Sequence, residues 1–173
     1  ISFTGGDPLL RQELSDLIKH ATDNGVAVGI LGNPNLLTHE VASKLKDAGI
    51  ARYQVSLDGM GKTHDRLRGR RGLFQDTLGA IETLNDVGIR SVVMFTVSGV
   101  NASELIDVIR LASEKKVSAF DFARLVPIGS GAQLKGKLIR PLEYRGLLLK
   151  VLDEYNSPIR EGSQTRFGRK DHL

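Results

Sequence analysis

Short apolar segments rich in β-formers alternate with longer segments of helical spacing, and this alternation constrains the fold more than any other feature. Because parallel strands need crossover connections, the pattern predicts an α/β fold, a parallel sheet with helices outside it. The expected strands are Ile1–Thr4, Val26–Leu31, Tyr53–Leu57, Ser91–Val97 and Phe120–Val126. The expected helices are Leu9–Asp23, Thr38–Asp47, Phe74–Val87, Ala102–Lys115 and Pro141–Tyr155.

Single residues at the ends of these segments support the expected helices and strands. Thr38 is a typical N-cap for the second helix, and Asn101 with Glu104 three residues later resembles a capping box. Ser91–Val97 and Val26–Leu31 are almost continuously apolar, which favours strands covered on both faces. A glycine lies one or two residues beyond the end of three expected helices, at Gly25, Gly49 and Gly88.

The chain has 173 residues, of which 40% are hydrophobic and 25% charged, as in an ordinary globular domain. A closed barrel of eight strand–helix units needs about 250 residues, so the choice lies between an open doubly wound sheet and part of a barrel. No apolar run approaches the roughly 20 residues that span a bilayer, and no signal peptide is recognisable, so we expect no membrane association and a cytoplasmic location. The absence of cysteine excludes a thiolate-bound zinc or iron–sulfur centre built from this chain alone.

The net charge of +4 is concentrated in two places. Between Lys62 and Arg71, five cations face one anion, which indicates an anion-binding loop rather than a nucleic-acid surface. Residues 157–173 are rich in glycine, serine and arginine, so we expect a basic linker or tail towards a further domain after a folded domain of residues 1–156, unless Phe167 finds an apolar groove. Because the chain opens in mid-strand at Ile1, we expect it to be a piece of a longer protein.

In both candidate folds the ligand site lies at the carboxyl ends of the strands. Gly5 and Gly6 allow close backbone approach to a ligand, although Asp7 can also serve simply as the anion at a helix start. Ser56 and Asp58 share a strand face and can contact ribose hydroxyls, or Asp58 can belong to a turn.

Two arginines stand out near these ends. Arg68 lies in the basic segment, and its planar fork suits a carboxylate, although a solvated loop is the alternative. Arg124 shares a strand face with Phe120 and Phe122, which indicates a site residue or an interior ion pair. His64 can be a base or a metal ligand, but a role at a helix start or in packing is favoured. The other histidines have no metal-like spacing, so we expect no metal ligands in this chain.

The order of these motifs resembles the radical S-adenosylmethionine (SAM) enzymes, especially the branch with an additional C-terminal SPASM or twitch domain. Together the motifs cover nearly all of residues 1–131. They are Ile1–Leu10, Ser56–Gly59, His64–Gly69, Gly72–Phe74, Val97 with Asn101, and Arg124–Gly129.

The resemblance implies a partial TIM-type (β/α) barrel, with about five units of a (β/α)6 core, and it implies SAM as cofactor. In the family the first unit carries a C-x-x-x-C-x-x-C loop that binds a [4Fe–4S] cluster. This chain has no cysteine and is expected to be inactive alone. Asp7 also stands where the family has glutamate, which is one methylene longer.

The resemblance also implies roles for single residues. Gly5, Gly6 and Asp7 match the contact to the methionine amino group, Ser56 the ribose contact, and Arg68 the partner of the methionine carboxylate. Asn33 matches an asparagine near the substrate side. The implied adenine shelf is Val126, Pro127, Ile128 and Gly129, and the candidates facing the substrate are Asp58, Asn101 and Arg124.

The implied activity is hydrogen abstraction by a 5′-deoxyadenosyl radical during peptide, protein or cofactor maturation, with an electron donor and a peptide substrate as partners. The alternatives are a non-catalytic nucleotide-binding or scaffold domain of the same fold, or a phosphate-binding barrel enzyme using Gly129–Gly131. We further expect self-association through the open edge at Ile1–Thr4.

Overall fold

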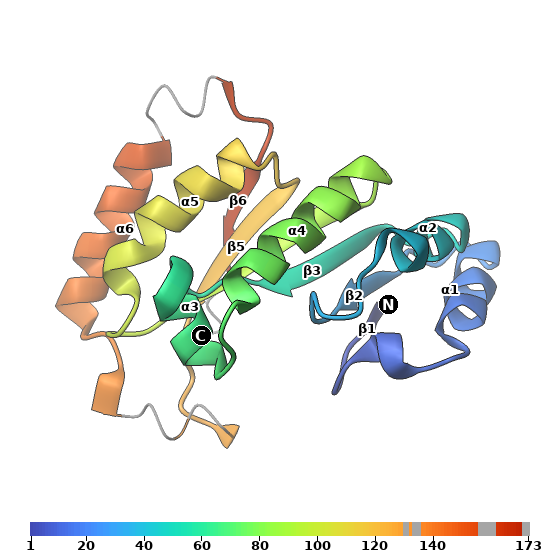
Figure 1. Cartoon of the computed structure of the whole chain (residues 1–173). Coiled ribbons are helices and arrows are strands. Elements are labelled where there is room, and N and C mark those ends of the chain that lie inside the picture. Colours follow the sequence, from blue (N-terminus) through green and yellow to red (C-terminus); the bar gives the residue numbers. More distant parts are fainter. Residues whose placement is uncertain (130–131, 133–135, 156–161, 171–173) are drawn as a thin grey trace.

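The computed structural model describes the chain except for residues 130–131, 133–135, 156–161 and 171–173. The described residues form a six-stranded sheet in which every neighbouring pair is parallel and the strand order is β1-β2-β3-β4-β5-β6 (Figure 1). This sequential order is that of a barrel, because a doubly wound sheet reverses its order at a switch point. β1 and β6 are the two edges, so the barrel is partial. The strands are β1 (Ser2–Phe3), β2 (Gly29–Leu31), β3 (Arg52–Ser56), β4 (Arg90–Val97), β5 (Ala119–Arg124) and β6 (Arg166–Arg169).

Helices connect successive strands. Figure 1 shows α1 and α2 beside β1 and β2, and α5 and α6 towards the other edge of the sheet. No helix in the described ranges is long and apolar enough to cross a membrane. The helices are η1 (Pro8–Leu10), α1 (Leu14–Asp23), α2 (His39–Asp47), α3 (Gly61–Arg68), α4 (Leu73–Asp86), η2 (Ala102–Glu104), α5 (Leu105–Glu114) and α6 (Pro141–Tyr155), of which η1 and η2 are short 3-10 helices.

The two faces of the sheet have different surroundings. In β3, Tyr53 and Val55 are buried beneath the helices, whereas Arg52, Gln54 and Ser56 are exposed or half-buried on the other face. The second face lines the lumen of the partial barrel. The expected cover on both faces is found for only part of the two strands: on the lumen face, Val92 of β4 is buried, whereas Met94 of β4 and Leu31 of β2 are half-buried. The helix-covered face carries the main core, including Ile18, Ile30, Leu45, Tyr53, Leu84, Phe95, Leu105 and Phe120.

The structure adds one strand to those expected. Residues 166–169, expected to belong to a linker, form β6, which pairs with β5. Phe167 lies 6.2 Å from both the Phe120 and the Tyr155 rings, measured between centroids, so it does find an apolar groove. The linker expectation is thus wrong for these four residues. The expected boundary after residue 156 lies outside the described residues.

Candidate cofactor site at the carboxyl ends of the strands

Asp58 follows β3 and is 5% exposed. Its Oδ1 accepts a hydrogen bond from the backbone N–H of Thr96 at 2.7 Å. Its Oδ2 accepts one from Nε of Arg68 at 2.6 Å, and Nη2 of the same guanidinium lies 2.5 Å away. The carboxylate therefore joins the ends of β3 and β4 to α3. Asp58, a sequence candidate for substrate contact, uses both of its oxygens within the chain.

Asn101 is buried below the same loops. Its Nδ2 donates to the carbonyl oxygens of Asp58 and Thr96, both at 2.9 Å. Its Oδ1 accepts from the N–H of Ser98 at 2.8 Å and from the Ser98 hydroxyl at 3.0 Å. An amide has two donor hydrogens and two acceptor positions, so all four are used. The geometry gives Asn101 a positioning role instead of a free face towards a substrate.

Glu104 has a role that the sequence did not indicate. Its Oε2 accepts from the N–H of Met60 and its Oε1 from the Thr63 hydroxyl, both at 2.7 Å. Asn101 makes no side-chain cap to the helix that follows it. The expected capping box is therefore wrong, because both side chains instead hold the loop between β3 and α3.

His64 lies at the centre of this region and is fully buried. Its Nδ1 accepts the N–H of Asp58 at 3.0 Å, and its ring contacts Phe74 edge-on. Burial lowers the pKa of the imidazole, and the neighbouring Arg68 charge lowers it further, against the opposing effect of Asp58. The imidazole is therefore neutral near pH 7, with its proton on Nε2, which has no hydrogen-bond partner in the described part of the chain. This confirms the expected packing role.

The loop after β1 leaves its backbone open. A Cβ at Gly5 or Gly6 would meet nothing within 4 Å, and Gly5 has a φ of +133°, which disfavours any side chain. Asp7 caps η1, with Oδ1 accepting the N–H of Leu9 at 3.1 Å. No hydrogen bond involves its other carboxylate oxygen among the described residues. A helix cap and an open backbone thus occur in the same loop.

The loop after β2 is fixed by a tyrosine. The Tyr53 hydroxyl donates to the carbonyl oxygen of Asn33 at 2.9 Å, and a Cβ at Gly32 would overlap that hydroxyl. Burial raises the pKa of Tyr53, and the nearby carboxylate of Asp7 raises it further. The side chain of Asn33 is exposed in the loop that follows β2.

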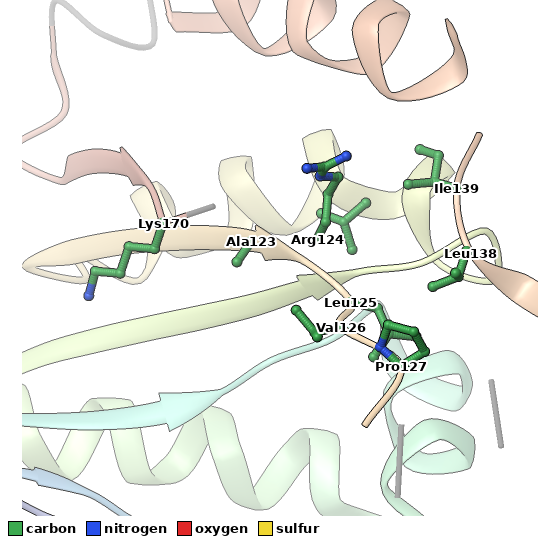
Figure 2. A pocket seen from close by; sticks show the side chains of 9 residues that line it. Ala123, Arg124, Leu125, Val126, Pro127, Leu138, Ile139 and Lys170 are labelled. Carbon is green, nitrogen blue, oxygen red and sulfur yellow. The ribbon is translucent and has the colours of Figure 1, made fainter. Parts of the chain in front are cut away.

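A cavity of about 310 Å³ lies at the ends of β4 and β5 (Figure 2). Val97, Leu125, Val126 and Pro127 give it mostly apolar walls. Val126 is 56% exposed and Ile128 74%, so large apolar side chains stand uncovered beside the cavity. Such a surface suits a flat heterocycle, as the expected adenine shelf requires.

Arg124 does not have the interior position that one of its two expected roles, an interior ion pair, requires. The residue is exposed, and its guanidinium carbon lies 5.0 Å from the ring centroid of Tyr144 in α6. Figure 2 shows Arg124 and Lys170 pointing to opposite sides of β5. Because β5 ends at Arg124, the guanidinium group of this residue lies outside the apolar layer that Phe120 and Phe122 occupy. Arg124 thus lines the cavity from the helix side and not from the lumen.

The residues at this end fit SAM, but the chain does not fit an iron–sulfur cluster. An open glycine backbone, a carboxylate oxygen and an apolar cavity match an ammonium group and an adenine. A cluster needs thiolate ligands, and the sequence contains no cysteine. The described residues also hold no group of three or more His, Asp or Glu side chains able to bind a metal.

An open parallel barrel with its polar loops gathered at the carboxyl ends of the strands defines the chain as a cofactor-binding (β/α) barrel domain. The profile of the Radical SAM superfamily matches residues 1–112. The chain therefore belongs to the radical SAM superfamily, whose members are enzymes that use SAM and a [4Fe–4S] cluster.

Individual relatives agree with this assignment. The AdoMet-dependent heme synthase of Methanosarcina barkeri is 36% identical over 147 residues, which cover 84% of this chain and 42% of that protein. The sporulation killing factor maturation protein SkfB of Bacillus subtilis is 29% identical over 133 residues, covering 77% of this chain and 32% of that protein. SuiB of Streptococcus suis, solved with bound SAM, superimposes with a TM-score of 0.81 at 18% identity, covering 98% of this chain and 39% of SuiB. The chain spans about two fifths of the length of the first of these relatives.

Proposed function

We propose that this chain is the SAM-binding core of a radical SAM enzyme that abstracts hydrogen from its substrate through a 5′-deoxyadenosyl radical. The observation that carries the proposal is the joint position of the open Gly5–Gly6 backbone and the apolar cavity at one end of the sheet. The residues of this chain bind and orient SAM. Because the chain offers no thiolate, we infer that it does not turn over SAM alone.

Each SAM group has a proposed partner. The Gly5–Gly6 backbone and the free oxygen of Asp7 bind the methionine ammonium, and Ser56, half-buried on the lumen side, binds a ribose hydroxyl. Adenine packs on the segment 126–129. Arg68 pairs with the methionine carboxylate. Its Nε and Nη2 already hold Asp58, which fixes the plane of the guanidinium and leaves Nη1 for the ligand.

Two substrate classes are compatible with the relatives. One comprises heme synthases, 34–36% identical to this chain, and the other contains peptide-modifying proteins such as SkfB at 29%. We propose a role in cofactor or peptide maturation, and the higher identity supports the cofactor class. A separate electron donor and a cytoplasmic location complete the proposal.

Binding of SAM to variants of Arg68 tests the assignment. Charge-assisted hydrogen bonds contribute about 1.5–3 kcal/mol, so Arg68→Ala in the full-length protein should weaken SAM binding by roughly tenfold or more. Arg68→Lys should recover only part of the loss, because lysine lacks the planar fork. Anaerobic calorimetric titration measures both affinities. Arg66→Ala, an exposed arginine of the same helix, is the matched control and should bind SAM normally.

Asp58→Asn separates a direct role of Arg68 from an indirect one. Asparagine still accepts the Thr96 N–H but no longer pairs with the guanidinium. A direct contact predicts a smaller loss for Asp58→Asn than for Arg68→Ala. If both Arg68 variants stay within about twofold of the wild type, as exposed charges usually do, Arg68 is not in the site.

The same titration tests the alternatives. A non-catalytic scaffold domain of this fold would not bind SAM, and a non-catalytic nucleotide-binding domain would bind a nucleotide in its place. A phosphate-binding enzyme would bind inorganic phosphate instead, through a glycine loop whose Ser130 and Gly131 lie outside the described residues. The open glycine backbone after β1 favours SAM over both.

A further inference from the structure

The lumen face of the sheet carries a second cavity, of about 490 Å³, towards the amino ends of the strands. Arg52 and Arg90, the first residues of β3 and β4, are direct cross-strand partners on this face. Both are exposed. Like charges placed directly opposite on neighbouring strands destabilise a sheet. The Arg52 side chain lies beside Gly29 of β2, and its Nη2 donates to the Ser2 hydroxyl at 3.3 Å. An anion in the cavity would offset the repulsion between the two arginines.

β6 adds cations to the same cavity. Arg166 lines it at the start of β6, and Lys170 lines it just beyond the end of the strand. Of the described residues lining the cavity, Asp121 carries the only carboxylate. That carboxylate is buried and already paired with Lys170, with 2.7 Å between Oδ2 and Nζ. Among the lining residues that the structure describes, no further carboxylate is available to neutralise the three arginines.

The wall between these cations is mixed. One register layer beyond the Arg52–Arg90 pair, Gln54 lies on the lumen side between Leu31 of β2 and Val92 of β4. An amide side chain there can donate a further hydrogen bond to an oxyanion. Arginine binds carboxylates and phosphates through two parallel hydrogen bonds. The cavity therefore suits a small molecule with more than one oxyanion group.

We propose that Arg52, Arg90 and Arg166 form a binding site for the acidic groups of a polyanionic small molecule in the lumen. Lys170 lines both this cavity and the cavity at the carboxyl ends of the strands. A ligand held at its acidic end by the arginines extends towards the proposed SAM site. The identification of this ligand as the substrate rests on the proposed function, whereas the anion site itself does not.

Titration of the full-length protein with tricarballylate, a compound with three carboxylates, tests the site. Arg52→Gln and Arg90→Gln should each weaken its binding by about tenfold, because each removes a charge-assisted pair of hydrogen bonds. Arg145→Gln, which removes an exposed arginine of α6, makes the same change in net charge away from the lumen and should bind normally. Pyrophosphate, titrated in parallel, distinguishes a phosphate from a carboxylate preference. Equal affinities in all four proteins would overturn the proposal.

Thermal unfolding without ligand gives a second readout. Removing one charge of the cross-strand pair should raise the melting temperature of Arg90→Gln, whereas tricarballylate should stabilise the wild type more than this variant. A lowered melting temperature of the unliganded variant together with unchanged stabilisation by tricarballylate would contradict the site. SAM titrations of the same variants keep the two proposals apart. Loss of tricarballylate binding with normal SAM affinity supports the lumen site alone.

Discussion

At the residue scale, the contacts of Asp58 show what a local pattern does and does not predict. The period of two correctly placed Ser56 and Asp58 at the end of a strand beside a glycine turn. The partners of Asp58 lie further away in sequence: Arg68 is ten positions on and Thr96 thirty-eight. Because such contacts depend on the fold, the sequence did not predict the ion pair between Asp58 and Arg68.

His64 should make stability depend on pH. The pKa of the His64 imidazole in the folded chain lies below the ordinary value of 6.5. At lower pH the imidazole is therefore protonated in the unfolded chain to a greater extent than in the folded chain. His64 therefore supports the fold fully above about pH 6.5, and its contribution decreases as the pH falls below that value, by at most about 1.4 kcal/mol per pH unit. Urea unfolding between pH 7.5 and 5 measures this slope.

The matched variant for this experiment is His64→Asn. The asparagine Oδ1 can accept the hydrogen bond from the Asp58 N–H that the histidine Nδ1 accepts in the wild type, but asparagine does not titrate. We expect the variant to be less stable at pH 7.5 because it leaves space beside Phe74, and to lose less stability than the wild type on acidification. Identical slopes for the two proteins would contradict a buried neutral imidazole.

At the element scale, the sequence predicted the elements with clear periodicity and missed the two that lack it. α6 begins and ends at the expected residues, Pro141 and Tyr155. α3 was expected to be a loop because half of its residues are charged and no apolar stripe marks a helix. In the structure, His64 is the buried residue of this helix. β6 was missed because four residues with two arginines carry no strand pattern; the pairing with β5 and the contact of Phe167 stabilise it.

Two glycine substitutions should have opposite effects on these elements. A Cβ at Gly168 would overlap Oδ1 of Asp121, which is buried and paired with Lys170. Gly168→Ala should therefore displace Asp121 and destabilise the fold by about 1–3 kcal/mol, the usual cost of overpacking. Gly146 lies in α6 with open space around its Cα, so Gly146→Ala should stabilise by about 0.5–1 kcal/mol. Urea unfolding of both variants measures the difference, and equal signs would contradict the placement of β6.

At the scale of the whole molecule, the alternation of strands and helices predicted the parallel sheet, and the family resemblance predicted the partial barrel. Neither indicated which strand face is open. The sequence of β4 is mostly apolar, yet its lumen side holds Arg90 and Thr96 as well as Val92 and Met94, in successive layers. The open edges leave this lumen accessible, and the charged lumen site proposed above follows from the arrangement of several strands rather than from any one segment.

The same open edges predict self-association through β1. β6 carries Arg166 and Arg169, and charges on an edge strand oppose pairing with another chain, whereas β1 carries only Ser2 and Phe3. The chain should therefore associate at β1, weakly because that strand has two residues. Light scattering of the 173-residue chain at increasing concentration should show a rising average mass.

A charge next to β1 provides the specific test of this edge. Thr4 is exposed just beyond the strand. The substitution Thr4→Lys should lower the average mass at high concentration, because a lysine at a sheet edge disfavours pairing with another chain. Gln75→Lys places the same charge on the exposed face of α4 and should leave the association unchanged. A monodisperse monomer at every concentration would show that two edge residues are too few to pair. Equal suppression by both variants would instead assign the association to net charge and not to β1.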